Sequence, residues 1–246
     1  MSQVAPDPAP DPVPGPPPGP APDRWIFEAR WSGRSDDLAT CAVRLHRCLT
    51  GLASVDPTLA EWFCEVDELA LDAAWLTDVL EYRAEPRRPS GWILTLWNGI
   101  EDNLAVAPIR IACGSPVGGA WDDIRFQLPR PAGAPALYDL ATMRALVEVM
   151  VSAWQPDWCR VRQGRFADPD SLRDDDSREP DDAGRSAVVP GSWLVYLARG
   201  RYARTRALPS EVRMAPVGDG EVFVLAPTPD ELRPETVERL RDAITP

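Results

Sequence analysis

Residues 24–63 read RWIFEARWSGRSDDLATCAVRLHRCLTGLASVDPTLAEWF, and this stretch predicts a strand, a turn and two helices in succession. Four apolar side chains fall on one face of the strand: Trp25, Phe27, Ala29 and Trp31. The opposite face is mostly charged, and this two-residue period is typical of a sheet with one side against a core. We therefore expect a half-buried strand at residues 25–31.

A long amphipathic helix is expected after this strand. Gly33 interrupts the strand pattern, and Ser35 is placed to cap the helix, with two aspartates in the first turn. Carboxylates stabilise the positive N-terminal end of a helix. Apolar residues then recur at helical spacing over residues 38–52, which predicts a buried stripe. Asp56 followed by Pro57 predicts the start of a second, short helix, because proline fits the first helical position.

The charge of the chain restricts the kind of partner that it can bind. The 246 residues carry a formal net charge of −12 and only one histidine. Nucleic-acid binding needs clustered cations that neutralise phosphates, so this balance argues against nucleic acid and permits a basic protein partner. The length suits one domain of ordinary to large size, or two small ones.

The five cysteines predict buried, reduced thiols. They are odd in number and form no CxxC pair. Cys41 and Cys48 lie on one predicted helix, about 10 Å apart along its axis, which is too far for a disulfide. The sequence contains no apolar run long enough to span a bilayer and no pattern of a signal peptide. We therefore expect a cytoplasmic protein.

Two segments have little to bury. Residues 1–23 contain ten prolines, which predicts a disordered, polyproline-like tail. Residues 167–184 contain eight acids and two arginines, so a mobile acidic loop is expected at about residues 166–187. The remaining chain, residues 24–246, is expected to form a single α+β domain.

The order of the remaining elements favours an α+β fold. Helices are expected at residues 64–82, 138–154 and 234–244, and strands at 91–99, 104–114, 120–129, 157–163, 190–198 and 221–226. In the first of these helices, Tyr82 is counted among the apolar positions. Runs of strands between helices, with short connections, predict a mainly antiparallel sheet with helices packed largely on one face.

The sequence contains no credible catalytic or metal-binding set. A nucleophile-histidine site would have to use His46, but His46 and Cys48 point to different sides of the predicted helix. A zinc site from Cys41, His46 and Cys48 lacks a fourth ligand and the usual spacing. The run of aspartates at residues 174–176 lacks the spacing of a calcium loop, and no phosphate-binding loop motif occurs. We expect a binding protein without catalytic residues, cofactor or metal.

One region is strongly acidic. No arginine occurs between Arg47 and Arg83, and eight acidic residues accumulate there. Such a one-signed surface repels itself at some cost to stability. It is either a solvated helical face or a docking face for a cationic partner, and the sequence leaves both open.

Several stretches together resemble the immunity protein 52 family of bacterial polymorphic toxin systems. They are residues 31–63, GWILTLWNG at 91–99, FQLP at 126–129, GSWLVYLA at 191–198 and GEVFVLAP at 220–227. The resemblance runs over residues 24–244 in order. The proline-rich tail and the acidic loop depart from the family pattern, and residues 65–89 are only loosely similar.

The resemblance implies an α+β protein that binds and neutralises a cognate toxin, commonly a nuclease with a restriction-endonuclease-like fold. It also implies scaffold roles for Trp31, Arg34 and Trp97, with Arg34 bracing a turn. Nucleases grip phosphates with cations, so an acidic inhibitor can use the same surface.

Our hypothesis is that five acidic residues contribute to the toxin-docking face: Glu61, Glu65, Asp67, Glu68 and Asp72. Two other classes of function remain as alternatives. The chain could be an adaptor or scaffold that acts through its proline-rich tail, or an enzyme whose acids converge on a divalent ion.

Overall fold

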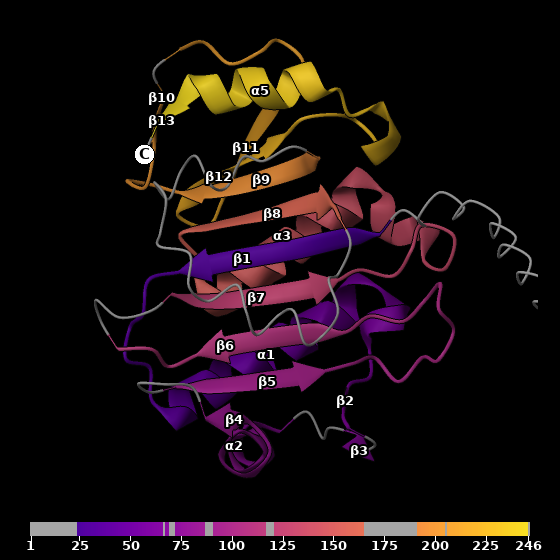
Figure 1. Ribbon diagram of the computed structural model, residues 1–246, viewed down its shortest axis with the longest axis vertical. Helices are drawn as coiled ribbons and strands as arrows, with labels where there is room; N and C mark the ends of the chain where they lie inside the picture. The colour runs from indigo at the N-terminus through magenta and orange to yellow at the C-terminus, as the bar shows by residue number, and fades with distance from the viewer. Residues whose placement is uncertain are drawn as a thin grey trace, which may run out of the picture.

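The computed structural model describes residues 24–65, 67–68, 72–86, 91–116, 121–164, 191–204 and 206–245 (Figure 1). The predicted proline-rich tail at residues 1–23 and the predicted acidic loop at residues 166–187 lie outside the described residues. The division into a tail and one domain therefore stays a prediction.

Within the described residues, nine strands form one antiparallel sheet. Its order is β11 (Arg213–Val217), β12 (Gly220–Val224), β9 (Ser192–Ala198), β8 (Trp158–Gln163), β1 (Trp25–Trp31), β7 (Asp122–Gln127), β6 (Ile109–Cys113), β5 (Trp92–Leu96) and β4 (Glu85–Pro86). The first predicted strand, β1, lies in the middle and pairs with β7 and β8. The predicted α+β class is confirmed, and β11 is a strand that the sequence pattern did not indicate.

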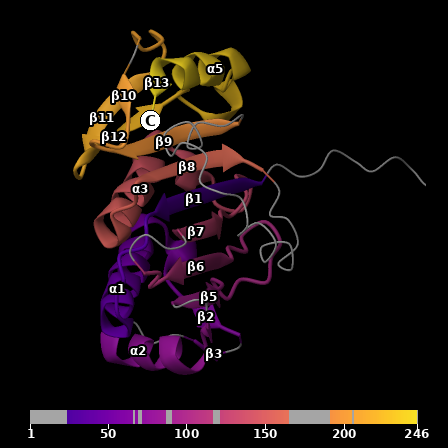
Figure 2. The ribbon, with the colours of Figure 1, turned by 60° about the vertical axis from the view of Figure 1, so that its left-hand side comes forward.

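Two long helices cover one face of the sheet. They are α1 (Leu38–Val55) and α3 (Leu140–Trp154), which lie side by side (Figures 1 and 2). Between them and the sheet is the main core, where Trp31 stacks on Trp154 with ring centroids 5.3 Å apart. In the same core Trp62 meets Phe126 edge to face at 5.8 Å. Such aromatic pairs stabilise a core beyond their buried area.

The last helix, α5 (Pro234–Ala243), packs against the opposite face at the β9–β12 end (Figure 2). Leu240 of α5 joins a second core with Trp158, Leu197 and Phe223. Because β9 is covered on both faces, all seven of its residues are buried. The described residues also contain smaller elements: the 3-10 turns Pro57–Leu59, Pro135–Tyr138 and Pro229–Glu231, and the strand pair β10 (Ala203–Arg204) and β13 (Ile244–Thr245).

The predicted cap of α1 was wrong by two residues. Asp37, not Ser35, is the N-cap, and its Oδ1 accepts a hydrogen bond from the amide of Thr40 at 2.8 Å. Ser35 instead takes a left-handed backbone conformation with φ +54°, which turns the chain from β1 into the helix. The cap at Asp56 is confirmed, although the following element is a single 3-10 turn.

The predicted helix at residues 64–82 was wrong at residues 64–65 and 67–68. Residues 63–68 contain the two short strands β2 (Phe63–Cys64) and β3 (Asp67–Glu68), joined by a turn at Glu65 with φ +58°. Phe63 and Trp97 exchange backbone hydrogen bonds of 2.8 and 3.0 Å, so β2 is attached to the end of β5. The helix α2 (Ala73–Tyr82) begins only after this hairpin.

Candidate functional site

The described residues offer no catalytic or metal centre. No group of three or more His, Cys, Asp or Glu residues among them could hold a metal ion. His46 is partly exposed on α1, whereas Cys41 and Cys48 are fully buried, so the three do not converge. Among the described residues, no helix has both the length and the apolar character that a membrane crossing needs. The site to consider is therefore a surface.

Three of the five predicted docking residues are exposed at the α2 end of the molecule. Glu61 lies just before β2, Glu65 lies in the β2–β3 turn, and Asp72 precedes α2. The backbones of Asp67 and Glu68 form β3, but their side chains lie outside what the structure describes. The structure therefore brings this acidic segment to the end of the sheet near β4 and β5 (Figure 1).

Two of these acids also have local structural roles. One carboxylate oxygen of Asp72 accepts hydrogen bonds from the amides of Ala74 and Trp75, at 2.9 and 3.0 Å, and so caps α2. Glu65 lies 3.4 Å from Arg83, the residue that follows α2. Because α2 is about 15 Å long, Glu65 and Asp72 lie toward opposite ends of the helix. The predicted residues thus line a surface and do not form one compact cluster.

Helix α2 adds an exposed aromatic residue that the sequence pattern misplaced. Tyr82 is 77% exposed, although the spacing counted it among the buried positions. Asp78 is exposed four residues earlier, so it lies on the same face of α2 as Tyr82, and Glu81 is exposed beside them. Tyrosines are enriched at protein interfaces, where a rigid ring supplies contact area. We call Glu61, Glu65, Asp78, Glu81 and Tyr82 the α2 surface.

An aromatic pair packs beside Glu65 of the α2 surface. The rings of Phe63 and Trp97 lie 5.7 Å apart, and the indole N–H of Trp97 donates to the backbone oxygen of Glu65 at 2.8 Å. Gly99 follows with φ +68°, and a Cβ there would lie 2.3 Å from the Phe63 ring. The tryptophan and glycine of the LWNG stretch thus hold Glu65 in place.

Trp31 and Arg34 lie where β1, α1 and α3 meet, and their contacts are structural. Trp31 is 1% exposed, and the Arg34 guanidinium lies 5.4 Å from its ring centroid. Arg34 also pairs with Asp36 at 3.5 Å and donates to the backbone oxygen of Gln155 at 3.5 Å. These contacts join the β1–α1 turn to the end of α3, which agrees with the bracing role expected for Arg34.

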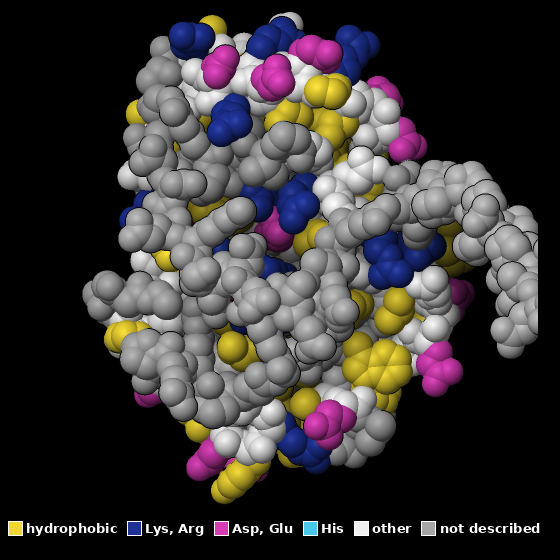
Figure 3. Space-filling view, in the orientation of Figure 1, with side chains coloured by type: hydrophobic (Ala, Val, Ile, Leu, Met, Phe, Trp, Pro, Cys, Tyr) yellow, Lys and Arg dark blue, Asp and Glu magenta, His cyan; other side chains and the backbone are white. Residues whose placement is uncertain are grey.

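The sheet face away from α1 and α3 carries charges of both signs. Basic and acidic side chains lie side by side near its middle (Figure 3). Glu28 of β1 pairs with Arg160 and Arg162 of β8, and Arg110 of β6 pairs with Asp123 of β7 at 2.9 Å. In each pair the positive and negative charges compensate each other, so we interpret these paired side chains as a structural network of the sheet.

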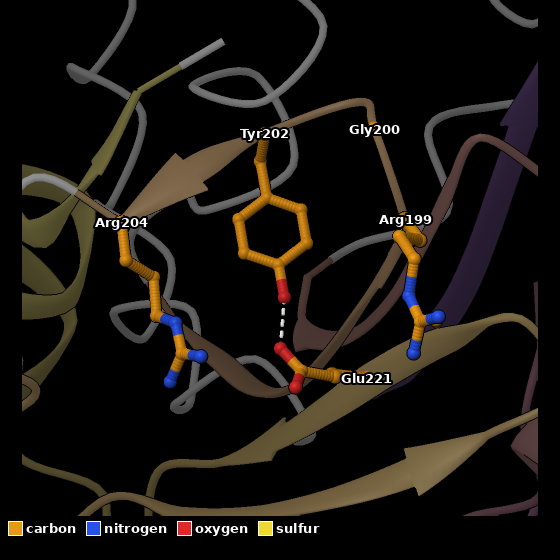
Figure 4. A pocket seen from close by; sticks show the side chains of 6 residues that line it. Arg199, Gly200, Tyr202, Arg204 and Glu221 are labelled. Atoms are coloured by element: carbon orange, nitrogen blue, oxygen red, sulfur yellow. Dashed lines mark hydrogen bonds between the residues drawn. The ribbon is translucent and has the colours of Figure 1, made fainter.

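A second surface feature lies at the opposite end of the sheet. The turn after β9 and the start of β12 enclose a pocket of about 350 Å³ that is lined by arginines, a tyrosine and a glutamate (Figure 4). Sequence reasoning noted an arginine-rich connection here but predicted no site.

Comparison with known proteins gives one family and one fold. The model of a family described as immunity protein 52 matches residues 23–237. No curated protein matches the chain. The solved structure of the Pseudomonas aeruginosa T6SS protein PA0821 is similar, with a TM-score of 0.54, 14% sequence identity, and coverage of 90% of this chain and 75% of that one. At this identity the structural likeness shows the fold alone.

Proposed function

Since the chain belongs to the immunity protein 52 family, we propose that it neutralises its cognate bacterial toxin by binding it and covering its active surface. The family makes the chain an immunity protein against a toxin. We propose further that the toxin is a nuclease with a restriction-endonuclease-like fold, and that the inhibitor acts in the cytoplasm without catalysis. The observation that carries this proposal is the family match over residues 23–237.

The proposed contact with the toxin is acidic and centred on the α2 surface. A nuclease must present cations to bind phosphates, and an acidic protein can occupy the same cations. The chain has a net charge of −12, and all four acids of the α2 surface are exposed, two of them on α2 with Tyr82. Tyr82 would supply an aromatic anchor inside a charged rim, the usual arrangement of residues that dominate binding energy. Asp67, Glu68 and Asp72 are included in the proposed face.

The test reverses the charge of the α2 surface and measures toxin association. The variant carries Glu61→Arg, Glu65→Arg, Asp78→Arg and Glu81→Arg, and it leaves Asp72 intact because Asp72 caps α2. Electrostatic steering raises association rates by 10–10³. We therefore expect association with the cognate toxin to slow by roughly tenfold or more at low salt, with a weaker salt dependence.

A matched control reverses four exposed acids near α5, at the other end of the sheet: Asp230, Glu231, Glu238 and Asp242. Both variants carry the same net charge, so a general charge effect would slow them equally. An association rate and salt slope that are unchanged in the α2-surface variant, or equally changed in the control, would remove the α2 surface from the mechanism.

Two further measurements test the rest of the proposal. Purified toxin should degrade nucleic acid, and an equimolar amount of this protein should stop the degradation. A chain that begins at Arg24 should protect cells as well as the full chain does. Loss of all protection on removal of residues 1–23 would instead favour an adaptor that acts through the proline-rich tail.

A further inference from the structure

The pocket at the far end of the sheet is built by a close approach of two strands. Its floor is where β12 begins beside the end of β9, and a Cβ on Gly220 would lie 2.3 Å from the backbone oxygen of Leu197. The turn at Gly200, which also lines the pocket, has φ +81° and no atom within 4 Å of where a Cβ would stand. Gly220 is therefore required for the close approach of β12 to β9, and Gly200 allows the left-handed turn beside the pocket.

One wall of the pocket is a fixed tyrosine. The ring of Tyr202 packs edge to face on Phe223 of the second core, with ring centroids 5.8 Å apart. Its hydroxyl donates a hydrogen bond to the carboxylate of Glu221 (Figure 4). Burial and this hydrogen bond raise the pKa of Tyr202 to about 12, so the hydroxyl stays protonated near neutral pH. The Tyr202–Glu221 pair is thus a rigid polar feature in the pocket.

Two arginines flank this pair. Arg199 and Arg204 lie on either side of Tyr202 and Glu221, with their guanidinium groups directed into the pocket (Figure 4). Both positive charges act on the Tyr202 hydroxyl, where they oppose the rise of its pKa. With two arginines and one glutamate, the lining has a net positive charge in a chain whose net charge is −12.

The two guanidinium groups lack a carboxylate partner among the described residues. Arg204 donates to the sulfur of Met214 at 3.5 Å, which is a weak acceptor, and Arg199 forms no side-chain ion pair there. Two other arginines of this end do have a carboxylate partner: Arg201 pairs with Asp157 at 2.8 Å, and Arg239 pairs with Glu211. Among the described residues, no carboxylate therefore occupies the guanidinium group of Arg199 or of Arg204.

We propose that this pocket binds a small oxyanion, a carboxylate or a phosphate, between Arg199 and Arg204. Guanidinium groups match the planar and tetrahedral oxygens of such anions with paired hydrogen bonds. A volume of about 350 Å³ is at the small end of ligand pockets and suits an anionic group better than a large apolar molecule. The oxyanion can belong to a free small molecule or to an acidic side chain of a protein. The site does not depend on the α2 surface, which lies at the opposite edge of the sheet.

The test titrates the full-length protein with three probes, inorganic phosphate, citrate and a short blocked peptide that contains glutamate, and follows arginine side-chain signals by NMR. The pocket variant is Arg199→Gln with Arg204→Gln. The matched control is Arg206→Gln with Arg213→Gln, which removes two exposed arginines of the same segment that do not line the pocket. Thermal unfolding of both variants checks that the fold is intact.

We expect at least one probe to bind saturably to the native protein and the control, and at least about tenfold more weakly to the pocket variant, because charged hydrogen bonds are lost. Saturation by phosphate or citrate identifies a free oxyanion as the ligand, and saturation by the peptide alone identifies a side chain of a partner. Absence of saturation with all three probes, or equal weakening in the control variant, overturns the proposal. Neither result bears on toxin neutralisation, which is measured separately.

Discussion

Glu28 is the buried charge whose environment the structure defines most fully. It lies in the central strand, is 12% exposed, and pairs with Arg160 and with Arg162, the latter at 2.8 Å. Burial alone would raise its pKa, but the charges and hydrogen bonds of the two arginines outweigh burial and lower the pKa to about 2. The ionised carboxylate therefore belongs to the folded state.

Removal of this carboxylate is predicted to destabilise the fold. Glu28→Gln removes the carboxylate that Arg160 and Arg162 share between two strands of the sheet, so we expect a loss of about 3 kcal/mol in the free energy of unfolding at neutral pH. The matched control is Glu148→Gln, which breaks only an exposed pair with Arg144 and should cost at most about 0.5 kcal/mol. Urea unfolding of both variants measures the difference, and equal losses would contradict a structural role for Glu28.

The pH dependence of stability follows from the same residue. The folded pKa of about 2 lies below the value of about 4.3 in an unfolded chain, so ionised Glu28 stabilises the fold above that unfolded pKa. This contribution is lost as the pH falls toward 2. Glu28→Gln should therefore show a flatter decline of stability between about pH 5 and pH 2 than the native protein does. Parallel declines would show that another group dominates acid unfolding.

At the scale of elements, the sequence pattern predicts a strand or helix correctly where the apolar residues keep one regular spacing along the whole element. The alternation of residues 25–31 and the helical stripe of residues 38–52 correspond to β1 and α1, because both elements bury one face on the same core. The pattern fails at residues 64–65 and 67–68, where polar and apolar residues fit either a helix or a hairpin. There the choice between helix and hairpin depends on the pairing of Phe63 with Trp97. These residues lie far apart in the sequence, so the spacing of apolar residues within the segment does not indicate the contact.

The candidate surfaces likewise have some features that the sequence predicts and others that depend on tertiary structure. The acidity of the α2 surface could be predicted, because acidic residues can be identified in the sequence without knowledge of tertiary contacts. The exposure of Tyr82 does not, because its spacing from Val79 fits the buried stripe and only the end of α2 at Tyr82 leaves it outside the core. The arginine pocket could not be predicted, since the sheet order brings Glu221 of β12 to Arg199 and Arg204.

The start of α1 gives a prediction that separates the expected cap from the observed one. Asp37→Ala removes the side-chain acceptor for the amide of Thr40 and should lower the unfolding midpoint by roughly 2 °C. Ser35→Gly should lower the midpoint less than Asp37→Ala does, because glycine takes the φ of +54° without strain. Thermal unfolding by circular dichroism measures both variants. A larger loss in Ser35→Gly than in Asp37→Ala would restore Ser35 as the residue that fixes the helix start.

At the scale of the whole molecule, the two candidate surfaces occupy opposite edges of one sheet. The α2 surface lies beyond β5, and the arginine pocket lies between β9 and β12, on the far side of the central strand β1. The paired charges of Glu28 and the arginines around it lie between these surfaces and hold the strands together. A partner could therefore occupy one surface and leave the other accessible.

The five cysteines allow the stability of these regions to be compared in one experiment. All five are free and buried, as expected from the sequence, and they lie on α1, β2, β6 and β8. Burial raises the pKa of the Cys48 thiol to about 12 and also raises that of Cys159, so neither forms the reactive thiolate in the folded state. Labelling of these thiols requires the core to open.

Cys64 should be labelled first. It lies in β2, whose pairing with β3 involves two residues on each side, at the edge of the molecule next to the α2 surface. Short peripheral elements open locally at lower free energy than the central sheet. In moderate denaturant we expect a thiol reagent to modify Cys64 at least about tenfold faster than the other four, which should react together on global unfolding. Cys64→Ser should remove only the fast phase, and toxin bound at the α2 surface should slow it. Equal rates at all five sites would mean that the β2–β3 hairpin opens only with the core.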